Sequence, residues 1–419
     1  SIFFEKTPKS KILLIYINRL MKTINNYPVI KKKVLLRVDL NVPLIDGIVS
    51  DKTRISAIKK TVQKLIEQEN KIFLLSHFGR PKGKYNSKYS LKFLCSILKD
   101  ILSLKKINFI NSFEDVEVEN LLNKMNFGEV SLFENIRFYE AEEKNDLNFS
   151  KKISKNFDIF VNDAFSASHR LHASIVGITK FLPSIAGYCL LSEIKNINSI
   201  FNNSQKPNLA IIGGSKISTK INLLKNLSKY FNEIAICGAM ANTFLLALGY
   251  NIGKSLVEND CKEIAISTIT KAKNYNCNII LPSDVVCSEK LNDRTNINEV
   301  SIKNILPNQM VLDIGELTIK KIKKSISKSN MILWNGPLGA FEHNPFDRGT
   351  IEIANAIKEN AKKIDMKTFA GGGDTISAIK KAKAEDGFSY ISNAGGAFLE
   401  WLEGHESAGI IALRENKID

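Results

Sequence analysis

The sequence predicts an α/β fold with two domains, each a mostly parallel sheet covered by helices on both faces. The chain has 419 residues, which is too long for a single core of ordinary size. From Met21 onward, short β-branched or apolar runs alternate with longer amphipathic stretches, and this alternation is typical of parallel sheets whose faces are covered by helices. The segment Ser184–Pro207 has no strand pattern but contains a helical run, so we place the domain junction there.

Nine strands are expected in chain order, on both sides of this junction. The runs before it are Lys33–Val38, Lys71–Leu75, Glu129–Phe133 and Ile159–Val161. Those after it are Asn208–Ile212, Glu233–Ile236, Asn278–Leu281, Met331–Leu333 and Lys367–Ala370. Each is a short apolar run, which is typical of a strand buried on both faces. Helical patterns between them include Thr53–Glu69, Ser218–Phe231 and Ile376–Lys383, and the junction itself contains Leu190–Phe201.

The first twenty residues differ in character from the rest, and we expect them to be a disordered extension. Their only apolar run, Ile12–Ile17, is six residues long and is not followed by a small-residue cleavage site. A signal peptide would have a longer apolar core, so a targeting segment is the less favoured alternative. No run in the chain approaches the roughly 20 apolar residues of a membrane helix, so we expect no membrane partner.

The net charge of +16 admits nucleic acid, a membrane surface or a small anion as partner. The lysines are dispersed among Asn and Ile residues, and the aromatic–basic signature of an RNA-binding module is missing from the sequence. We therefore expect no specific nucleic-acid partner, although a basic nucleic-acid binder stays an alternative function. The six cysteines include no C-x-x-C pair, which favours reduced thiols and a cytoplasmic location.

The stretch Gly371-Gly372-Gly373-Asp374-Thr375, directly before a predicted helix, is the most informative motif. Consecutive glycines allow positive φ and let a ligand approach the backbone. The N–H groups of a first helical turn favour anions, and phosphate above all. Asp374 supplies a carboxylate suited to a metal ion, and Thr375 supplies a capping hydroxyl. Alone, the motif fits a flexible loop equally well.

Polar side chains follow the strands of the first half at the points where those strands end. They are Arg37, Asp39–Asn41, Arg54, His77–Pro81, Arg137 and Arg170. Ligands of such sheets bind at the carboxyl ends of the strands, so we expect these arginines to converge on one rim. Their planar forks suit carboxylate or phosphate, which predicts a small, multiply charged anion. A single arginine of this kind could equally be a surface ion pair, and a rim histidine could be a packing residue.

The second half carries glycine-rich turns with lysines, which suit a nucleoside polyphosphate. Gly213-Gly214-Ser215-Lys216 follows a predicted strand, and Lys220 lies four residues further on, where a helix would place both ammonium groups on one face. Two more such turns are Trp334–Glu342 and Asn393–Phe398. The segment Gly249–Ser255 resembles a phosphate-binding Walker A loop but has one residue too few and follows a helical run, so we interpret it as coincidence.

Seven motifs, taken in order, resemble those of the phosphoglycerate kinase family. They are R-V-D-L-N-V-P (Arg37–Pro43), S-H-F-G-R-P (Ser76–Pro81), E-N-I-R-F (Glu134–Phe138), V-N-D-A-F…H-R (Val161–Arg170), G-G-S-K-I-S-T-K (Gly213–Lys220), W-N-G-P-L-G-A-F-E (Trp334–Glu342) and G-G-G-D-T (Gly371–Thr375). The resemblance covers residues 21–419. It implies two Rossmann-like domains joined by a hinge helix, and reversible, magnesium-dependent transfer of the acyl phosphate of 1,3-bisphosphoglycerate to ADP, giving ATP and 3-phosphoglycerate in glycolysis.

The resemblance also implies a role for individual residues of this chain. The phosphoglycerate would be held by Asp39, Leu40, Asn41, Arg54, His77, Phe78, Gly79, Arg80, Arg137 and Arg170. The nucleotide would be held by Gly213, Lys216, Lys220, Gly238, Asn335, Pro337, Glu342, Gly372, Gly373, Asp374 and Thr375, with Mg²⁺ on Asp374 and the ribose hydroxyls on Glu342. Catalysis would fall to Arg54, Lys216, Lys220, Gly372 and Gly395, with Arg54 and Lys216 nearest the transferring group.

The implied domain plan has five parts. Residues 1–20 form the extension, 21–187 the phosphoglycerate domain, 188–206 the hinge helix, 207–398 the nucleotide domain, and 399–419 a segment returning to the first domain. The protein is expected to be a monomer.

Two segments depart from the family pattern, C-G-A-M-A-N at Cys237–Asn242 and S-N-A-G-G-A-F at Ser392–Phe398. A nucleotide-dependent kinase acting on a different small carboxylate or phosphate is the remaining enzymatic alternative.

Overall fold

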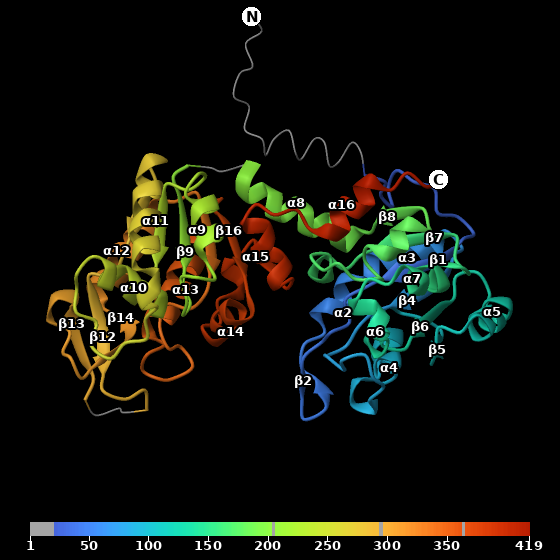
Figure 1. Cartoon of the computed structure of the whole chain (residues 1–419), viewed down its shortest axis with the longest axis horizontal. Helices are drawn as coiled ribbons and strands as arrows, with labels where there is room; N and C mark the ends of the chain where they lie inside the picture. Colours follow the sequence, from blue (N-terminus) through green and yellow to red (C-terminus); the bar gives the residue numbers. More distant parts are fainter. Residues whose placement is uncertain (1–20, 203–205, 293–295, 363–364) are drawn as a thin grey trace, which may run out of the picture. The chain divides into compact units, whose positions relative to one another are not determined.

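The computed structural model describes residues 21–202, 206–292, 296–362 and 365–419 (Figure 1). The chain forms two compact units. The first runs to Asn198 and includes Glu406–Asp419, and the second is Ser199–His405. The extension expected at residues 1–20 lies outside the described residues, as do residues 203–205 of the expected hinge helix.

The first unit is built on a six-stranded sheet in which every neighbouring pair of strands is parallel. The strand order is β5 (Ile107–Ile110), β6 (Val130–Phe133), β4 (Lys71–Leu75), β1 (Lys33–Arg37), β7 (Ile159–Asn162) and β8 (Ser184–Ala186). The central strands β4 and β1 each contribute four consecutive buried residues. Both faces of the sheet are therefore covered, as the continuous apolar runs predicted.

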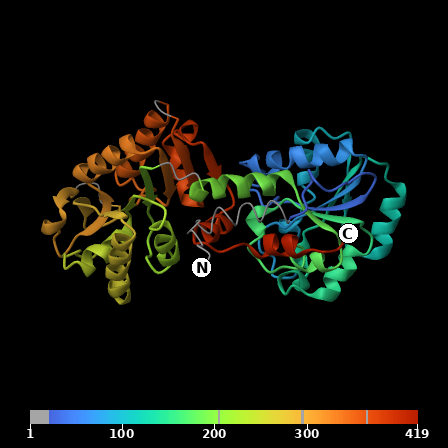
Figure 2. The ribbon, with the colours of Figure 1, turned by 90° about the horizontal axis from the view of Figure 1, so that it is seen from above.

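Alternate residues of β1 enter two separate cores. Val34 and Leu36 pack with the buried residues of α2 (Thr53–Ala57), α3 (Lys59–Glu67) and α4 (Leu94–Ile101). Leu35, on the opposite face, packs with those of α5 (Asp115–Lys124) and α7 (Leu147–Ser154). Figure 2 shows these two helical layers on either side of the sheet. Because successive side chains of a strand point to opposite faces, the central sheet is covered by one layer of helices on each side, which gives three layers.

The end of the chain belongs to the first unit. In the first turn of helix α16 (Ala408–Glu415), Gly409 donates its N–H to the carbonyl oxygen of Ser168 over 2.7 Å. Just beyond the helix, the side chain of Asn416 accepts a hydrogen bond of 3.0 Å from the N–H of Ser184 at the start of β8. Helix α8 (Tyr188–Asn202) follows β8, and the division between the two units falls within it.

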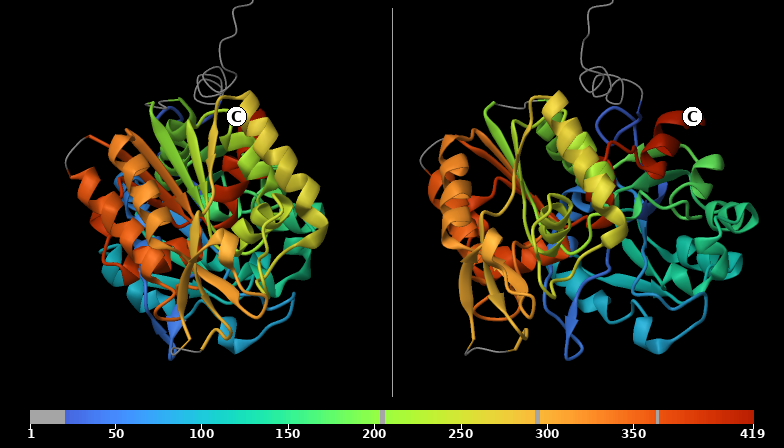
Figure 3. Two further views of the ribbon diagram at one scale, coloured as in Figure 1. Left: turned by 90° about the vertical axis from the view of Figure 1, so that its left-hand side faces the viewer. Right: turned by 60° about the vertical axis from the view of Figure 1, so that its left-hand side comes forward.

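The second unit contains a second six-stranded parallel sheet. Its order is β11 (Asn278–Ile280), β10 (Glu233–Ile236), β9 (Asn208–Ile212), β15 (Met331–Asn335), β16 (Lys367–Gly371) and β17 (Tyr390–Ser392). One face carries α12 (Glu316–Lys328), α13 (Arg348–Ala361) and α14 (Gly373–Lys381), and the other carries α9 (Ile221–Leu227), α10 (Ala239–Ala247) and α11 (Lys262–Asn274) (Figures 2 and 3). The predicted α/β class with two helix-covered parallel sheets is therefore confirmed.

Smaller elements complete the units. A three-stranded antiparallel sheet of the second unit pairs β12 (Asp284–Ser288) with β13 (Asn298–Ser301) and β14 (Met310–Ile314). The first unit has a short hairpin of β2 (Leu44–Ile45) and β3 (Ile48–Val49). Helix α6 (Glu140–Glu143) follows β6, and α15 (Gly396–Leu402) follows β17.

Some expectations about single elements were wrong. The segment Ser184–Pro207 does contain a strand, β8, which is only three residues long. The helix expected over Thr53–Glu69 is interrupted at Ile58, giving α2 and α3. The helix expected from Ser218 to Phe231 is restricted to α9, because a turn at residues 218–220 precedes it. In that turn the carboxylate of Glu258 accepts the N–H of Ser218 over 3.0 Å.

Candidate active site

In the first unit, the loop after β1 and the start of α2 are tied together by charge. Nη1 of Arg54 donates to Oδ2 of Asp39 over 2.7 Å and to the carbonyl oxygen of Asn41 over 3.0 Å. The hydroxyl of Ser166, from the loop after β7, donates to the same carboxylate. The N–H of Leu40 donates to Oγ of Ser76 over 2.9 Å, which fixes this loop to the end of β4. The carboxylate of Asp39 therefore links the loop after β1 to the start of α2 and to the loop after β7.

The loop after β4 joins this cluster through Gly79. Its N–H donates to Oδ1 of Asn41 over 2.9 Å, and its carbonyl oxygen accepts from Nη1 of Arg137 over 2.8 Å. Gly79 has φ +60°, and a Cβ there would lie 2.4 Å from the ring of Tyr89, so this tight turn requires glycine. The preceding residue, Phe78, is buried and donates its N–H to Asn135.

Positive charge gathers around His77. Burial lowers the pKa of its imidazole well below the ordinary value, and four arginines lower it further: Arg37, Arg137, Arg170 and Arg54. Burial, Arg170 and Arg37 also lower the pKa of Arg137, to about 10. Positive groups that depress one another's pKa in this way are stabilised when an anion binds between them. The predicted convergence of strand-end arginines is present at these positions.

Two arginines of the predicted set differ from the others. Nε of Arg170 donates to Nε2 of His169 over 3.3 Å, and among the described residues its terminal nitrogens form no hydrogen bond. Arg80 is exposed, and within the described ranges it forms no hydrogen bond or ion pair. The structure therefore places Arg80 at the surface of the loop after β4, without fixing its guanidinium against the other predicted side chains.

In the second unit, two glycine-rich loops approach each other closely. Gly213, at the end of β9, donates its N–H to the carbonyl oxygen of Asn335 over 2.9 Å. A Cβ on Gly213 would lie 1.9 Å from the carbonyl oxygen of Pro337, and one on Gly336 would lie 2.4 Å from that of Gly213. Gly238, with φ +69°, immediately precedes α10 and donates to the carbonyl oxygen of Leu338. Only glycine allows this approach of backbones.

Asn335 connects these loops to the G-G-G-D-T turn. Its buried side chain accepts a hydrogen bond from the ammonium of Lys220 and donates to the carbonyl oxygen of Gly371 over 2.6 Å. Thr375 accepts the N–H of Gly336 at Oγ1 over 2.7 Å. Burial lowers the pKa of Lys220, whereas the charges of Glu403 and Asp374 act to raise it. The predicted Lys220, Asn335 and Thr375 are therefore brought together.

Two helices begin at residues with glycine-specific backbone angles. Gly372 has φ +101° and precedes α14, and Gly395 has φ +55° and precedes α15. Gly373 and Asp374 are exposed in the first turn of α14. The first N–H groups of a helix have no partner within it, so this turn can bind an anion. Helix α14 begins at Gly373, three residues before the predicted Ile376, and ends at Lys381 instead of Lys383.

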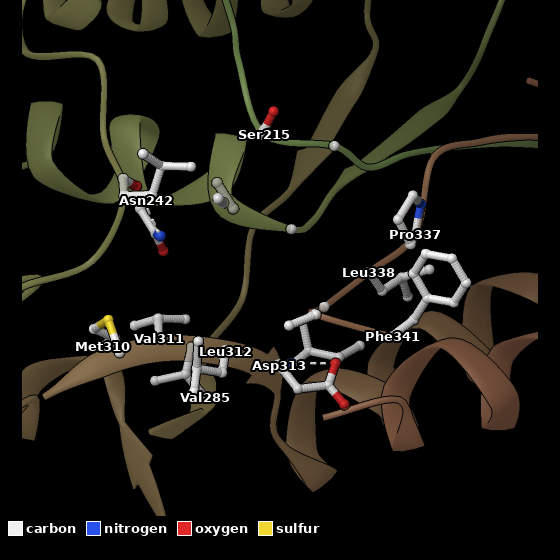
Figure 4. A pocket seen from close by; sticks show the side chains of 18 of the residues that line it. Ser215, Asn242, Val285, Met310, Val311, Leu312, Asp313, Pro337, Leu338 and Phe341 are labelled. Atoms are coloured by element: carbon white, nitrogen blue, oxygen red, sulfur yellow. Dashed lines mark hydrogen bonds between the residues drawn. The ribbon is translucent and has the colours of Figure 1, made fainter. Parts of the chain in front are cut away.

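A cavity of about 400 Å³ lies beside these loops (Figure 4). Its walls include the predicted Gly238, Pro337, Glu342 and Asp374. The rest of the lining is largely apolar, with Leu256, Val285, Met310, Val311, Leu312, Leu338 and Phe341. An apolar pocket with a few polar groups at its margin is typical of a small-molecule site.

Comparisons with known proteins bear on the whole chain. The family model described as "Phosphoglycerate kinase" matches residues 24–405. The phosphoglycerate kinase of Rhizobium meliloti (strain 1021) is 44% identical over 384 residues, which are 92% of this chain and 96% of that protein. The phosphoglycerate kinase of Chelativorans sp. (strain BNC1) is 42% identical with the same coverage. The structure of phosphoglycerate kinase from Coxiella burnetii superposes with a TM-score of 0.84 at 37% identity, covering 94% of this chain and 98% of that one.

The chain belongs to the phosphoglycerate kinase family. The resemblance recognised from the seven motifs is confirmed, and so is the activity it implied, that of a phosphoglycerate kinase. As a member of this family, the chain is a transferase, a kinase that binds ATP and acts in glycolysis. Within the described ranges, none of the helices is long and apolar enough to cross a membrane.

The two lysines of the phosphoglycerate kinase motif G-G-S-K-I-S-T-K do not lie on one helical face, as had been predicted. Lys216 and Lys220 were expected on one helical face, but α9 begins only at Ile221. Lys216 lies in the exposed loop before the turn, and Lys220 immediately precedes the helix. The turn forms because Thr219 donates its hydroxyl to the carbonyl oxygen of Lys216 over 2.9 Å. Their shared role in nucleotide binding cannot rest on helical spacing and remains a prediction.

Sequence reasoning missed the apolar lining of the cavity and Ser166. The lining comes from segments as far apart as Leu256, Val285 and Phe341, and each residue looks like an ordinary core residue in the sequence.

The segment Gly249–Ser255, which we interpreted as a coincidental resemblance to a Walker A loop, follows α10 as expected. Its Lys254 donates its backbone N–H to the carbonyl oxygen of Gln309 over 2.7 Å. The segment therefore packs beside β14 as a structural turn.

Proposed function

We propose that, in transferring the acyl phosphate of 1,3-bisphosphoglycerate to ADP and in the reverse reaction with ATP and 3-phosphoglycerate, the chain binds the phosphoglycerate in its first unit and the nucleotide in its second. The observation that supports these roles best is the distribution of the two kinds of site. The arginine cluster around His77 belongs to the first unit, and the glycine loops with their apolar cavity belong to the second. A small polyanion suits the former, and a nucleoside polyphosphate suits the latter.

In the first unit, Arg137, Arg170, Arg80 and His77 would bind the phosphate and carboxylate oxygens of phosphoglycerate. Arginine presents a planar fork that matches both groups. Asp39 and Asn41 would accept hydrogen bonds from the hydroxyl of the substrate. Leu40, Phe78 and Gly79 would shape the loops that carry these groups, since their backbone N–H groups are tied to Ser76, Asn135 and Asn41.

In the second unit, the apolar cavity would take the adenine ring, and Glu342 at its margin would accept the ribose hydroxyls. The phosphates would extend toward the first turn of α14, where Gly372, Gly373 and Thr375 offer backbone N–H groups. Lys216 and Lys220 would neutralise the phosphate charge. Gly213, Gly238, Asn335 and Pro337 would hold the loops close enough for these contacts.

Magnesium fits the donor set at Asp374. Among the described residues there is no cluster of three or more His, Cys, Asp or Glu side chains able to hold a metal ion. Mg²⁺ bound to nucleotides needs only one or two carboxylates, because phosphate oxygens and waters complete its octahedron. The single exposed carboxylate of Asp374, in the first turn of α14, matches this need. When bound, the ion would neutralise charge on the phosphates.

The chemistry requires neither a general acid nor a general base. An ionised β-phosphate oxygen of ADP attacks the phosphorus, the bond from phosphorus to the acyl oxygen breaks, and the carboxylate leaves with the electron pair. What remains is to align the reactants and to neutralise the charge of the transferring group. Arg54, Lys216, Lys220 and the N–H groups at Gly372 and Gly395 would do this.

Because the two sites belong to different units, transfer requires the substrates to be brought together. We infer that α8 acts as the hinge, since the division between the units falls within it. Closure would also exclude water, which would otherwise hydrolyse the acyl phosphate. Small-angle scattering with and without both substrates tests this, and an unchanged radius of gyration would count against it.

A coupled assay with ATP, magnesium and 3-phosphoglycerate tests the proposed reaction. Turnover that depends on all three supports it, and turnover with another small carboxylate in place of 3-phosphoglycerate would favour the alternative kinase. Asp374→Asn should raise the magnesium concentration needed for half-maximal rate, whereas Asp386→Asn, at an exposed aspartate of the same unit, should leave it unchanged.

Salt-sensitive retention on RNA or DNA would reveal the nucleic-acid alternative. Light scattering would test the expected monomer.

A further inference from the structure

A buried chain of hydrogen bonds lies behind His77. Glu142, on α6, is completely buried and accepts both the N–H of Ser174, over 2.8 Å, and its hydroxyl, over 2.6 Å. The hydroxyl of Ser174 in turn accepts Nε–H of Arg37 over 3.0 Å. Arg37 then reaches Nδ1 of His77 with Nη2 over 3.1 Å, and donates from Nη1 to the carbonyl oxygen of Val38. A carboxylate is thus connected to the imidazole through one hydroxyl and one guanidinium.

This chain decides which nitrogen of His77 carries the proton. A guanidinium has only donors, so Nδ1 can meet Arg37 only as an acceptor. The proton of the neutral ring must therefore be on Nε2. Among the described residues Nε2 has no hydrogen-bond partner. The lowered pKa of His77, caused by burial and then by the surrounding arginines, keeps the ring in this neutral form.

Arg37 cannot itself contact a substrate, because only 1% of its surface is exposed. Its burial acts to lower its pKa, and the negative charge of Glu142 is the largest influence that opposes this. For Glu142, burial acts to raise the pKa, but the hydrogen bond from His172, the charge of Arg37 and the hydrogen bond from Ser174 lower it. Glu142 therefore stays ionised, and its negative charge balances the positive charge of the Arg37 guanidinium. Without such a partner, a buried charge would strongly destabilise the fold.

We propose that Arg37, oriented by Ser174 and Glu142, is a positioning residue that holds His77 as the tautomer with its proton on Nε2. The neutral ring then donates this N–H to an anionic oxygen of bound phosphoglycerate. This role rests on the proposed function for the identity of the ligand, but the tautomer itself does not. This role distinguishes Arg37 from the other strand-end arginines, which under the proposed function would contact the anion directly.

The tautomer can be measured by nitrogen NMR of the full chain with ¹⁵N-labelled histidine. The chain has five histidines, and the signals of His77 are identified by their loss in His77→Phe. We expect a protonated Nε2 and an unprotonated Nδ1 in the wild type. A proton on Nδ1, or on both nitrogens, would overturn the proposal. The measurement needs no substrate, so it is independent of whether the assay detects turnover.

A double-mutant cycle tests the effect on substrate. Arg37→Met should mix the two tautomers and raise KM for 3-phosphoglycerate by about tenfold, the effect of one hydrogen bond to a charged group, with KM for ATP unchanged. In the His77→Phe background the same substitution should have no further effect on KM. An equal effect in both backgrounds would show that Arg37 acts structurally and not through His77.

Two further measurements complete the test. Glu140→Gln controls for the loss of a carboxylate from α6 that leaves Glu142 in place. Glu140 lies on the same helix as Glu142 but is exposed and paired with Lys144. This substitution should leave both the tautomer and KM unchanged. Should Arg37→Met not fold, the spectrum of the wild type still decides the tautomer, and Arg37→Lys, which keeps the charge but loses the fork, supplies the kinetic comparison.

Discussion

Nη1 of Arg54 lies 2.7 Å from Oδ2 of Asp39, so in this structure the arginine proposed to stabilise the transferring group is paired with a carboxylate. The side chain of Arg54 is 28% exposed and that of Asp39 is 13% exposed. A pair at this depth orients the guanidinium without burying it. Asp39 therefore holds Arg54 at the rim, and a substrate anion would compete for the same nitrogen.

Arg54→Ala should lower kcat by several hundredfold or more, because a catalytic arginine contributes about 10³-fold or more in related phosphoryl transfers. The affinity for ATP should stay unchanged, since Arg54 belongs to the first unit. Arg54→Lys keeps the positive charge but not the planar fork of the guanidinium, so its kcat should lie between those of the wild type and Arg54→Ala. Stopped-flow or coupled assays measure kcat, and Lys59→Ala on the next helix is the control. A loss of less than about tenfold would move the main role elsewhere, first to Lys216.

The two glycines Gly213 and Gly373 should respond oppositely to alanine. A Cβ at Gly213 would lie 1.9 Å from a carbonyl oxygen, so Gly213→Ala should destabilise the fold by about 1–3 kcal/mol. At Gly373 a Cβ meets nothing within 4 Å, and alanine favours the helix. Gly373→Ala should therefore keep or raise the melting temperature.

The space beside Gly373 is where we expect phosphate to bind, so Gly373→Ala should still weaken ATP binding, by roughly tenfold. Calorimetry of ATP binding measures this, and Ser377→Ala, one turn further along α14, is the control. Unchanged affinity in Gly373→Ala would place the phosphates elsewhere than at the start of this helix.

The cavity wall gives a prediction with a closely matched control. Leu256 lines the cavity and is 60% exposed, whereas Leu317 is 63% exposed on α12 and is not part of the lining. Leu256→Ser should raise the dissociation constant of ADP roughly three- to tenfold, through the loss of apolar contact with the base. Leu317→Ser should leave it unchanged. Equal effects of the two substitutions would contradict the assignment of this cavity to adenine.

How far the sequence predicts this fold depends on the element. Lys71–Leu75, Asn208–Ile212 and Glu233–Ile236 are strands at the predicted residues, because an apolar run bounded by polar residues leaves little freedom in a buried parallel sheet. β8 and β17 have only three residues each, too few for a period to appear. β13, with the sequence N-E-V-S, forms a strand only because β12 lies beside it.

How far the sequence predicts the candidate site also differs from residue to residue. Glycines and arginines at strand ends could be predicted, because close approach and anion binding require those residue types. Leu256 and Val311 could not, because nothing in an apolar side chain distinguishes a ligand wall from a core. Lys216 and Lys220 show a third case, in which the residues were identified but their geometry was wrong, since Glu258 stabilises a turn from a distant segment.

The last prediction concerns pH and the start of α8. Oδ1 of Asp163 accepts the N–H of Leu190 over 3.1 Å. Burial raises the pKa of Asp163 to about 6, although hydrogen bonds from Thr61 and from the N–H groups of Leu190 and Cys189 act to lower it. The folded protein thus holds this proton more tightly than the unfolded chain, whose aspartate pKa is about 3.9.

The sign of the effect on stability follows from this difference. The contribution of Asp163 is fully present below about pH 4 and is lost as pH rises through about 6, because ionisation is then less favourable in the folded state. In the wild type this loss should amount to about 3 kcal/mol at most. Asp163→Asn keeps an oxygen acceptor for Leu190 but does not ionise, so it should gain stability relative to the wild type between pH 4 and pH 7.

Urea denaturation followed by circular dichroism at pH 4 and pH 7 measures this gain. Asp100→Asn, at an exposed aspartate of the same unit, reports the effect of losing one surface charge. A stability difference between Asp163→Asn and the wild type that is the same at both pH values would show that folding does not raise the pKa of Asp163. In that case the hydrogen bonds at the start of α8 would outweigh the burial of the carboxylate.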